Sequence, residues 1–507
     1  MPDVTVVVWN VETFGDAWPA VRGGDYTPIC RFMAQALYEV KADVFIMMEL
    51  RRGGAQYLPT LKAALEAQPG AAAQPAVPAG PGVPAQSAVP AHVWNYDYIP
   101  GSVLPPFGDP VGPASFDYTQ QGHGEGYAVL WRNQPDFTVL RTRNAFSRNI
   151  VGGESKIGLV LQGRTPTTNV PRPLWYQAPN FDPAAPPAAW TRLGFPAATP
   201  PLQGQARWNL SRRPCYVVLG LNRPGPPERR LLPIVVHHST SPNPLRNPRS
   251  TPWSVQLAAY SAQLYQVDDT SHGATTMVTV EQALAAGDFN IDHNEATSWQ
   301  REAYDYFTND FGPGGANDGG ANLPTTWVDS ANAPDNHTAV RLSRWHGPKL
   351  PPEQITAANV DAYRWLAIDN LFIRDLPTVN PPAPYRGPVY NVLSGLQAGG
   401  FLVDTPAKQA VIRSFRDAVL AALGAPHAGG GGTNYPYIGP ANTPCRTRKR
   451  KTDGTYSFSA PVIGNLMSYT DYMADLQLGH FTSARRAAEF YVNSISDHLP
   501  LVYRFTV

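Results

Sequence analysis

The sequence predicts an α/β sandwich, in which two β-sheets pack against each other and helices lie outside them. Runs of β-branched and aromatic residues outnumber the segments with helical periodicity, and the helical segments fall at intervals between those runs. The hydrophobic share of 43% in 507 residues is ample for a large core. The 43 Gly and 53 Pro residues make up about a fifth of the chain, against about 12% in average usage, so we expect much irregular chain around that core.

The first part of the chain shows the alternation clearly. Val4–Asn10 and Asp43–Met48 are short apolar runs typical of buried strands, and Pro28–Lys41 between them has helical spacing with Pro in its first turn. Gln56–Ala67 is a short helix by the same criterion. Further strands are predicted at Tyr127–Arg132, Phe137–Arg141, Cys215–Leu221, Leu231–His237, Met277–Ala286, Leu366–Arg374 and Leu499–Val507, and further helices at Trp253–Val267 and Thr405–Leu423.

We expect one domain over residues 1–507, with long insertions between its core elements. The segment 69–91 is rich in Ala, Pro and Gly, which is typical of an extended surface loop. Loops of this length are usually functional or disordered. The insertions are expected at about 68–122, 164–210, 305–360 and 376–490, the last of which is long enough for a small subdomain.

Charge and cysteine content exclude several classes of protein. A net charge of +1 argues against a protein that coats nucleic acid without specificity. Three widely separated cysteines form neither a disulfide framework nor a zinc-binding pattern. No apolar run is long enough to span a membrane, and the N-terminus lacks a signal-peptide pattern. We therefore expect a soluble, intracellular protein, with export by another route left open, and no obligate protein partner.

Polar side chains stand at the ends of several predicted strands. Taken singly, each is more simply a turn residue or a cap. If the strands share a direction, however, their ends converge on one rim of a sheet, where carboxylates, amides and imidazoles would form a site for a hard cation. These residues are Asn10, Glu49, His237, His238, Asp288, Asn290, Asp369, Asn370, Asp497 and His498.

The motifs around these residues resemble those of the endonuclease/exonuclease/phosphatase superfamily, and they occur in the same order. The pair GDFN (287–290) and SDHLPL (496–501) is the most specific part of the resemblance. The others are WNVETF (9–14), MMEL (47–50), EGYAVLWR (125–132), RRP (212–214), HHSTSP (237–242) and IDNLFI (368–373). The interval from Asp369 to Asp497 is longer than such enzymes usually show.

The resemblance implies a four-layer, deoxyribonuclease I-like sandwich that hydrolyses phosphate esters with Mg²⁺, or alternatively Mn²⁺. A divalent ion offsets the charge of the ester and holds a non-bridging oxygen. Glu49 matches the family's metal-binding Glu, and Asn10 matches the Asn that helps to place the metal. Asp497 matches a further carboxylate on the metal side. Glu12 stands where some relatives have an acidic metal ligand and others a basic residue.

The resemblance also implies catalytic roles. Asp288 matches the Asp that orients or deprotonates the attacking water, and His498 matches a His that contacts the phosphate. Which of these two is the base stays open. Asp369 matches the partner that holds His498, and Asn290 would stabilise the phosphate charge. Of the two adjacent histidines, His238 fits the catalytic position, and His237 should face the other way as a structural residue. The expected substrate contacts are Asn10, Asn290, His238 and Arg213.

The substrate is less constrained by the motifs. Basic clusters, of which Arg446–Lys451 is the densest, favour an endonuclease that acts on DNA, with RNA as an open alternative. A solvated charged loop is an equally simple interpretation of that cluster. A second hypothesis is a phosphoesterase that acts on a lipid head group, an inositol phosphate or a nucleotide. A third is a non-catalytic module that binds a partner through the insertions.

Overall fold

The computed structural model of the chain describes the core elements and the segments that adjoin them. The described residues are 3–14, 26–50, 52–68, 92–99, 126–144, 215–225, 230–238, 266–269, 276–279, 282–290, 292, 337–344, 353–355, 357–374, 389–398, 436–437, 446–450, 456–458, 475, 478 and 480–506.

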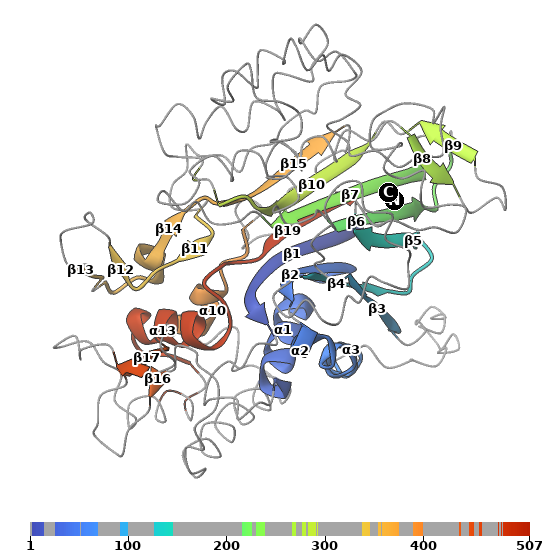
Figure 1. Cartoon of the computed structure of the whole chain (residues 1–507). Helices are drawn as coiled ribbons and strands as arrows, with labels where there is room; N and C mark the ends of the chain where they lie inside the picture. The colour runs from blue at the N-terminus through green and yellow to red at the C-terminus, as the bar shows by residue number, and fades with distance from the viewer. Residues whose placement is uncertain are drawn as a thin grey trace, which may run out of the picture.

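Two five-stranded sheets form the centre of the molecule (Figure 1). The strand order of the first sheet is β19-β1-β2-β4-β3, and that of the second is β15-β10-β7-β6-β5. The first comprises β1 (Asp3–Phe14), β2 (Val44–Leu50), β3 (Trp94–Ile99), β4 (Gly126–Arg132) and β19 (Leu501–Thr506). The second comprises β5 (Phe137–Asn144), β6 (Cys215–Leu221), β7 (Leu231–His238), β10 (Ala283–Asp288) and β15 (Asp369–Arg374).

The two sheets are mixed and face each other strand by strand. Within the first sheet β1 pairs parallel with β2, and within the second β10 pairs parallel with β7; the other pairs are antiparallel. Between the sheets β1 contacts β10, β2 contacts β7, and β15 contacts β19. The buried apolar side chains of both sheets belong to one continuous core. The predicted α/β sandwich is therefore confirmed.

Helices pack beside the first sheet, where α1 (Thr27–Glu39), α2 (Arg52–Ala55) and α3 (Leu58–Glu66) lie together (Figure 1). α1 has Pro28 in its first turn, and its side chains at Ile29, Phe32 and Ala36 are buried. This spacing of three and four residues places them on one face of the helix. The predicted helices at 28–41 and 56–67 are thus confirmed to within a few residues.

Several boundaries differ from the prediction. The run Met277–Ala286 forms two strands, β9 (Thr276–Thr279) and β10, because polar Gln282 comes between them and accepts a hydrogen bond from Arg223. Leu366–Arg374 is likewise divided between β14 (Arg364–Leu366) and β15. The end of the helix predicted at 253–267 lies in strand β8 (Gln266–Asp269), while its remainder and the helix predicted at 405–423 fall outside the described residues.

Two core elements lie in blocks that we expected to be insertions. β3 falls within 68–122 and forms the edge of the first sheet. α13 (Ala484–Ser494) falls at the end of 376–490 and packs against α10 (Val392–Ala398). The smaller elements are β11 (Ala339–Val340), β12 (Ser343–Arg344), β13 (Glu353–Gln354), the 3₁₀ helix η6 (Val360–Tyr363), β16 (Pro436–Tyr437), β17 (Arg446–Arg450) and β18 (Tyr456–Phe458).

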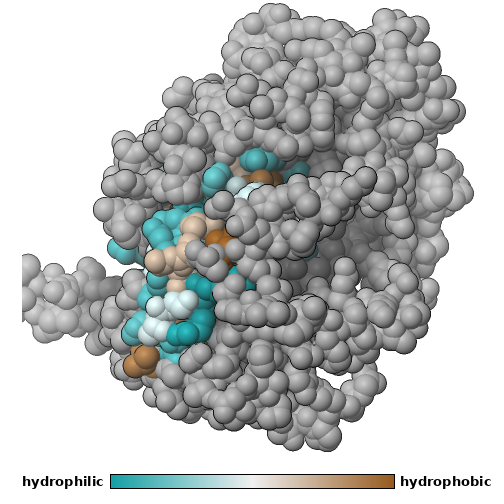
Figure 2. All heavy atoms as spheres, turned by 90° about the vertical axis from the view of Figure 1, so that its left-hand side faces the viewer, coloured by the Kyte–Doolittle hydropathy of each residue, from teal (hydrophilic) through white to brown (hydrophobic). Residues whose placement is uncertain are grey.

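The described surface shows no large apolar expanse on the face drawn in Figure 2. Hydrophilic residues predominate among those coloured there, and the apolar ones form small separate spots. None of the helices in the described ranges combines the length and the apolar character that a membrane crossing requires.

Candidate active site

Four strands from the two sheets bring polar side chains together at one place. β1 contributes Asn10, β2 contributes Glu49, β7 contributes His238 and β10 contributes Asp288. Asn10 is completely buried, and its Nδ2 donates to Glu49 Oε1 at 3.0 Å and to Asp288 Oδ2 at 2.9 Å. One amide therefore joins a carboxylate of the first sheet to a carboxylate of the second. The predicted convergence of these side chains is present in the structure, although β1 continues past Asn10 to Phe14.

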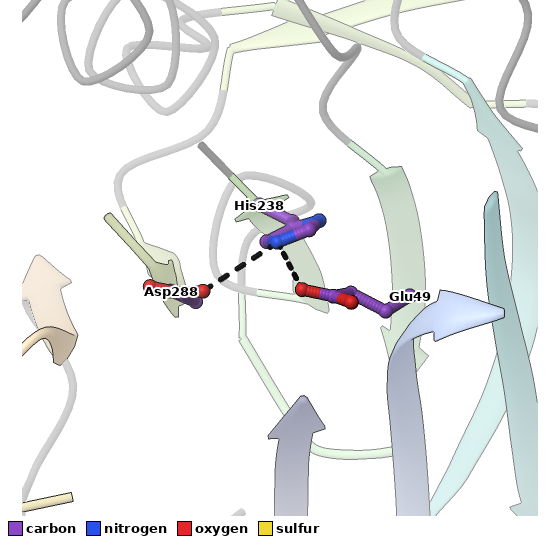
Figure 3. Close-up of side chains that lie close together, drawn as sticks. All are labelled: Glu49, His238 and Asp288. Atoms are coloured by element: carbon purple, nitrogen blue, oxygen red, sulfur yellow. Dashed lines mark ion pairs between the residues drawn. The ribbon is translucent and has the colours of Figure 1, made fainter. Parts of the chain in front are cut away.

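His238 completes this junction. Its Nε2 lies 2.6 Å from Glu49 Oε1 and 3.5 Å from Asp288 Oδ2. Figure 3 shows that the three side chains point toward one another from three separate strands. Glu49, His238 and Asp288 form one of two groups in the described chain whose potential metal-ligating atoms all lie within 4.8 Å of one another.

The second such group contains Asp288, Asp369 and His498. Asp369 begins β15, and its Oδ2 lies 2.8 Å from His498 Nδ1. The other ring nitrogen of His498, Nε2, lies 3.8 Å from Asp288 Oδ2. Asp369 therefore fixes the orientation of the ring, and the ring presents its second nitrogen to the centre of the site.

Asn290 donates two hydrogen bonds to the carboxylate of Asp288. Its backbone N–H donates to Asp288 Oδ1 at 2.9 Å, and its Nδ2 donates to Asp288 Oδ2 at 3.0 Å. The two side chains therefore point to the same place. Asn290 has a left-handed φ of 53°, which Asn tolerates better than most residues. Asp288 thus receives three hydrogen bonds from two Asn residues, all on its carboxylate oxygens.

Unusual backbone geometry concentrates at the same place. Glu49 has φ 59° within a strand, and the pairing registers of β1 with β2 and of β2 with β4 both shift next to it. A left-handed φ in a non-Gly residue costs free energy and persists where the surroundings fix it. The shift in register directs the Glu49 carboxylate toward the second sheet.

Burial and neighbouring charges perturb the acid–base groups. Burial raises the pKa of Asp288 to about 6; the negative charges of Asp369 and Glu49 add to this, and His498 and His238 oppose it. For His498, burial alone would lower the pKa, but Asp369, Asp497 and Asp288 together raise it well above the ordinary value. His498 is therefore favoured as the charged imidazolium at neutral pH.

The donor set fits a divalent cation. Glu49, Asp288 and Asp369 place three carboxylates in a largely buried site, and burial of uncompensated negative charge is costly. Carboxylate oxygens suit Mg²⁺, and Mn²⁺ accepts both oxygen and imidazole ligands. The group with the shortest contacts includes His238, so the donor atoms are compatible with either ion.

The other predicted residues are placed less centrally. Asp497 lies at the rim with its side chain 42% exposed, 3.5 Å from His498 Nε2, and belongs to neither of the two groups. His237 is buried and turns away, with its ring 6.4 Å from that of Phe289. Glu12 lies in β1, but its side chain is outside the described part, and Arg213 lies outside the described residues altogether.

Sequence reasoning missed four residues that support the site. The hydroxyl of Tyr127, on β4, accepts a hydrogen bond from the backbone N–H of His238 at 3.3 Å. Ser496 Oγ accepts from the N–H of His498, and the carbonyl of His498 accepts from Trp9 Nε1 and the Tyr491 hydroxyl. Tyr127 and Ser496 stand inside quoted motifs, which was the available signal.

A model of the endonuclease/exonuclease/phosphatase family matches residues 7–447 of the chain. No curated protein matches it in sequence. Among solved structures, the chain is similar to an endonuclease/exonuclease/phosphatase family protein from Bacteroides thetaiotaomicron, with 12% identity over 99% of this chain and 98% of that one and a TM-score of 0.33.

Two further structures show similar values. The catalytic domain of human nocturnin has 10% identity over 75% of this chain and 86% of that chain, with a TM-score of 0.32. TDP2 of D. rerio, complexed with a single-strand DNA product, has 9% identity over the full length of both chains, with a TM-score of 0.33. Similarity at this level does not indicate a substrate for this chain.

Proposed function

The chain belongs to the endonuclease/exonuclease/phosphatase family, and from this premise we propose that it is a metal-dependent phosphodiesterase whose substrate is DNA. The observation that carries the proposal is the convergence of Asn10, Glu49, His238, Asp288 and the Asp369–His498 pair on one buried site. Carboxylates and imidazoles at this spacing suit the hydrolysis of a phosphate ester.

Glu49 and Asp288 would hold the cation, with Asn10 fixing the distance between them. When bound, a divalent cation offsets the negative charge of the phosphate and polarises its oxygens. Asp497, whose side chain is partly exposed although its Oδ1 is buried, would add a further carboxylate. The short contact of Glu49 with His238 places the imidazole next to the same position.

The remaining residues would act on the phosphate and on the attacking water. His498, charged and held by Asp369, offers Nε2–H to a phosphate oxygen. Asn290 adds an amide donor, and His238 contacts the opposite side. Because His498 already carries its proton, it does not accept one from the attacking water; the Asp288 carboxylate, which would also hold the cation, would orient that water and accept its proton.

The choice of DNA rests on charge. β17 consists of the residues Arg446–Arg450, four of which are basic, and it is the central strand of a three-stranded sheet. Five residues of the basic cluster, Arg446–Arg450, form this strand, and Lys451 lies outside the described residues. Basic side chains bind phosphates without reading base sequence, which suits a nuclease of low sequence specificity.

A nicking assay tests the proposal. Supercoiled plasmid is incubated with the protein and Mg²⁺ or Mn²⁺, with and without chelator, and hydrolysis of bis(p-nitrophenyl) phosphate is measured in parallel. The Asp288→Ala variant, purified identically, controls for contaminating nucleases. We expect metal-dependent nicking that the variant lacks. Hydrolysis of the small diester without nicking would contradict the DNA assignment and favour a smaller phosphoester, and absence of both would contradict an enzymatic function.

A further inference from the structure

We propose that Thr338 is a positioning residue, whose hydroxyl holds the backbone of Asp369 so that the Asp369 carboxylate stays on the ring of His498. Thr338 belongs to none of the sequence motifs, and it comes from the block 305–360 that we expected to be an insertion. The inference rests on the proposed phosphoesterase function and deepens it.

The hydroxyl of Thr338 bridges the interruption between β14 and β15. Thr338 is completely buried, and its Oγ1 accepts a hydrogen bond from the backbone N–H of Asp369 at 3.1 Å. The same hydroxyl donates to the carbonyl of Leu366 at 3.4 Å, while the Thr338 backbone N–H donates to that carbonyl at 2.8 Å. A buried N–H without an acceptor is costly, so this hydroxyl helps to hold Asp369 at the start of its strand, together with the pairing of Asp369 and Asp288 between β15 and β10.

The segment Thr338–Val340 also pairs with the chain that carries His498. The N–H of Leu499 donates to the carbonyl of Thr338 at 2.8 Å, and the N–H of Val340 donates to the carbonyl of Asp497 at 2.7 Å. Ala339 forms a β-bridge with His498. The segment therefore lies between Asp369 and His498, which are 129 residues apart in sequence. By binding the backbone of both, it supports the 2.8 Å contact between their side chains.

The backbone of His498 is fixed by other groups as well. Its N–H donates to Ser496 Oγ at 2.9 Å, and its carbonyl accepts from Trp9 Nε1 at 2.9 Å. The Tyr491 hydroxyl donates to the same carbonyl. Loss of the Thr338 hydroxyl would therefore leave the backbone N–H of Asp369 without this acceptor and loosen its end of β15, while the backbone of His498 stays in place. The expected consequence is a ring that is less well oriented by its carboxylate, within a site that is otherwise intact.

Two substitutions separate this role from simple packing. Thr338→Val removes the hydroxyl and keeps the branched shape, and Thr338→Ser keeps the hydroxyl. The matched control is Thr5→Val, because Thr5 is also buried in a strand and its Oγ1 accepts a hydrogen bond from Arg504 Nε at 3.2 Å. Thr5 lies five residues before Asn10 on β1, roughly 16 Å from it in an extended strand.

Steady-state hydrolysis of bis(p-nitrophenyl) phosphate gives the first result. Misplacement of a catalytic group reduces the rate of the chemical step more than it reduces binding, so we expect Thr338→Val to lower kcat roughly ten-fold with KM unchanged. Thr338→Ser should restore kcat, and Thr5→Val should leave it near the wild-type value. Equal losses in Thr338→Val and Thr5→Val, or no recovery in Thr338→Ser, would overturn the proposal.

A double variant tests whether Thr338 acts through Asp369. If it does, Thr338→Val should have little further effect on kcat in an Asp369→Asn background, because residues that act as a unit are not additive. The same fold-loss in both backgrounds would contradict the proposal.

A measurement that does not depend on catalysis can distinguish failure of this inference from failure of the proposed function. The Nδ1–H proton of His498 gives an NMR signal that can be assigned by its loss in His498→Gln. We expect this signal to shift or broaden in Thr338→Val, and to remain in Thr338→Ser and Thr5→Val. An unchanged signal in Thr338→Val would overturn the role of Thr338. A changed signal in a protein without phosphoesterase activity would instead contradict the proposed function alone.

Discussion

The Nε2 atom of His498 lies 3.8 Å from Oδ2 of Asp288, beyond hydrogen-bonding distance and close enough for a strong electrostatic interaction. Each group favours the charged form of the other, and Asp369 adds negative charge behind the ring. Between pH 6 and the raised pKa of His498, the favoured state is a carboxylate facing an imidazolium. In the proposed mechanism, this state leaves proton acceptance to Asp288 and phosphate binding to His498.

Loss of either group should abolish most of the activity. His498→Ala and Asp288→Ala each remove a group that acts in the transition state, so we expect kcat to fall by about 10² to 10⁴ in each. Initial rates on bis(p-nitrophenyl) phosphate measure this, and circular dichroism checks that the variants are folded. Rates near wild type in both folded variants would disprove the site assignment.

The charge on Asp288 should destabilise the protein in the absence of metal. Its pKa is about 6 in the folded protein against an ordinary value of 3.8, so the folded state disfavours the ionised form. The cost is absent below pH 3.8, develops as the pH rises, and is fully present above pH 6. Asp288→Asn should therefore stabilise the chelated protein at pH 8 by roughly 1–3 kcal/mol, and by less at pH 5.

Urea unfolding in chelator at the two pH values measures this difference. The prediction applies to an inactive variant, so stability and activity should change in opposite directions at the same residue, as at other functional sites that carry strain. A variant less stable than wild type at pH 8 would show that the Asp288 carboxylate is net stabilising.

A bound cation should stabilise the folded protein more strongly at high pH than at low pH, and its removal should abolish this stabilisation. A cation bound only by the folded state, at 100 times its dissociation constant, contributes about 2.7 kcal/mol. Protons compete with the cation for Asp288, so the rise in melting temperature on adding Mg²⁺ or Mn²⁺ should be larger at pH 8 than at pH 5. Thermal unfolding with metal and with chelator measures it. Glu49→Gln is the control, and a full shift in that variant would place the cation elsewhere.

The site residues could be predicted because each stands at the boundary of an apolar run. Asn10, Glu49 and Asp288 end the apolar runs of recognisable strands in the sequence, although β1 itself continues to Phe14. The resemblance of the motifs to those of the family then indicated that these residues, which are far apart in the chain, belong to one site. Hydrogen bonds such as that from Asn10 to Asp288, which spans 278 residues, depend on the packing of the two sheets and have no local signal.

The supporting residues could not be predicted for the same reason. Thr338 stands in an irregular stretch, and its role appears only when β14, β15 and the segment before β19 are brought together. Tyr127 lies within an apolar strand, where an aromatic residue is typical of the core. β3 was assigned to the same insertion as the neighbouring Ala- and Pro-rich segment, although its alternation of aromatic and polar residues is typical of a strand.

Gly287 should be irreplaceable next to the site. Its φ is 150°, and a Cβ there would lie 1.8 Å from the carbonyl oxygen of His237 on the paired strand β7. Gly287→Ala must therefore separate β10 from β7, and we expect a loss of more than about 3 kcal/mol in the free energy of unfolding. Gly225→Ala is the control, because Gly225 has a similar φ of 143° and no atom within 4 Å of the added Cβ. If both variants lost the same free energy of unfolding, backbone strain alone would explain the loss, and the clash with His237 would contribute nothing.

The basic strand β17 should determine how strongly DNA binding depends on salt. Each phosphate neutralised by a Lys or Arg contributes about 0.9 to the slope of log K against log salt, so replacing the basic residues of Arg446–Lys451 by Gln should flatten that slope by several units. Fluorescence anisotropy with a labelled duplex across a salt series measures it. Hydrolysis of a small diester should be unchanged, because that substrate does not extend beyond the site.

The control for this experiment removes charge from a different surface. Arg31 and Lys41 are exposed at α1, and their replacement by Gln alters the net charge without touching β17. We expect a slope close to wild type in this variant, since counterion release reflects local phosphate contacts and net charge acts only weakly at physiological ionic strength. Equal flattening in both variants would show that overall charge, and not β17, governs binding. A wild-type slope in the β17 variant would place the DNA contacts on another surface.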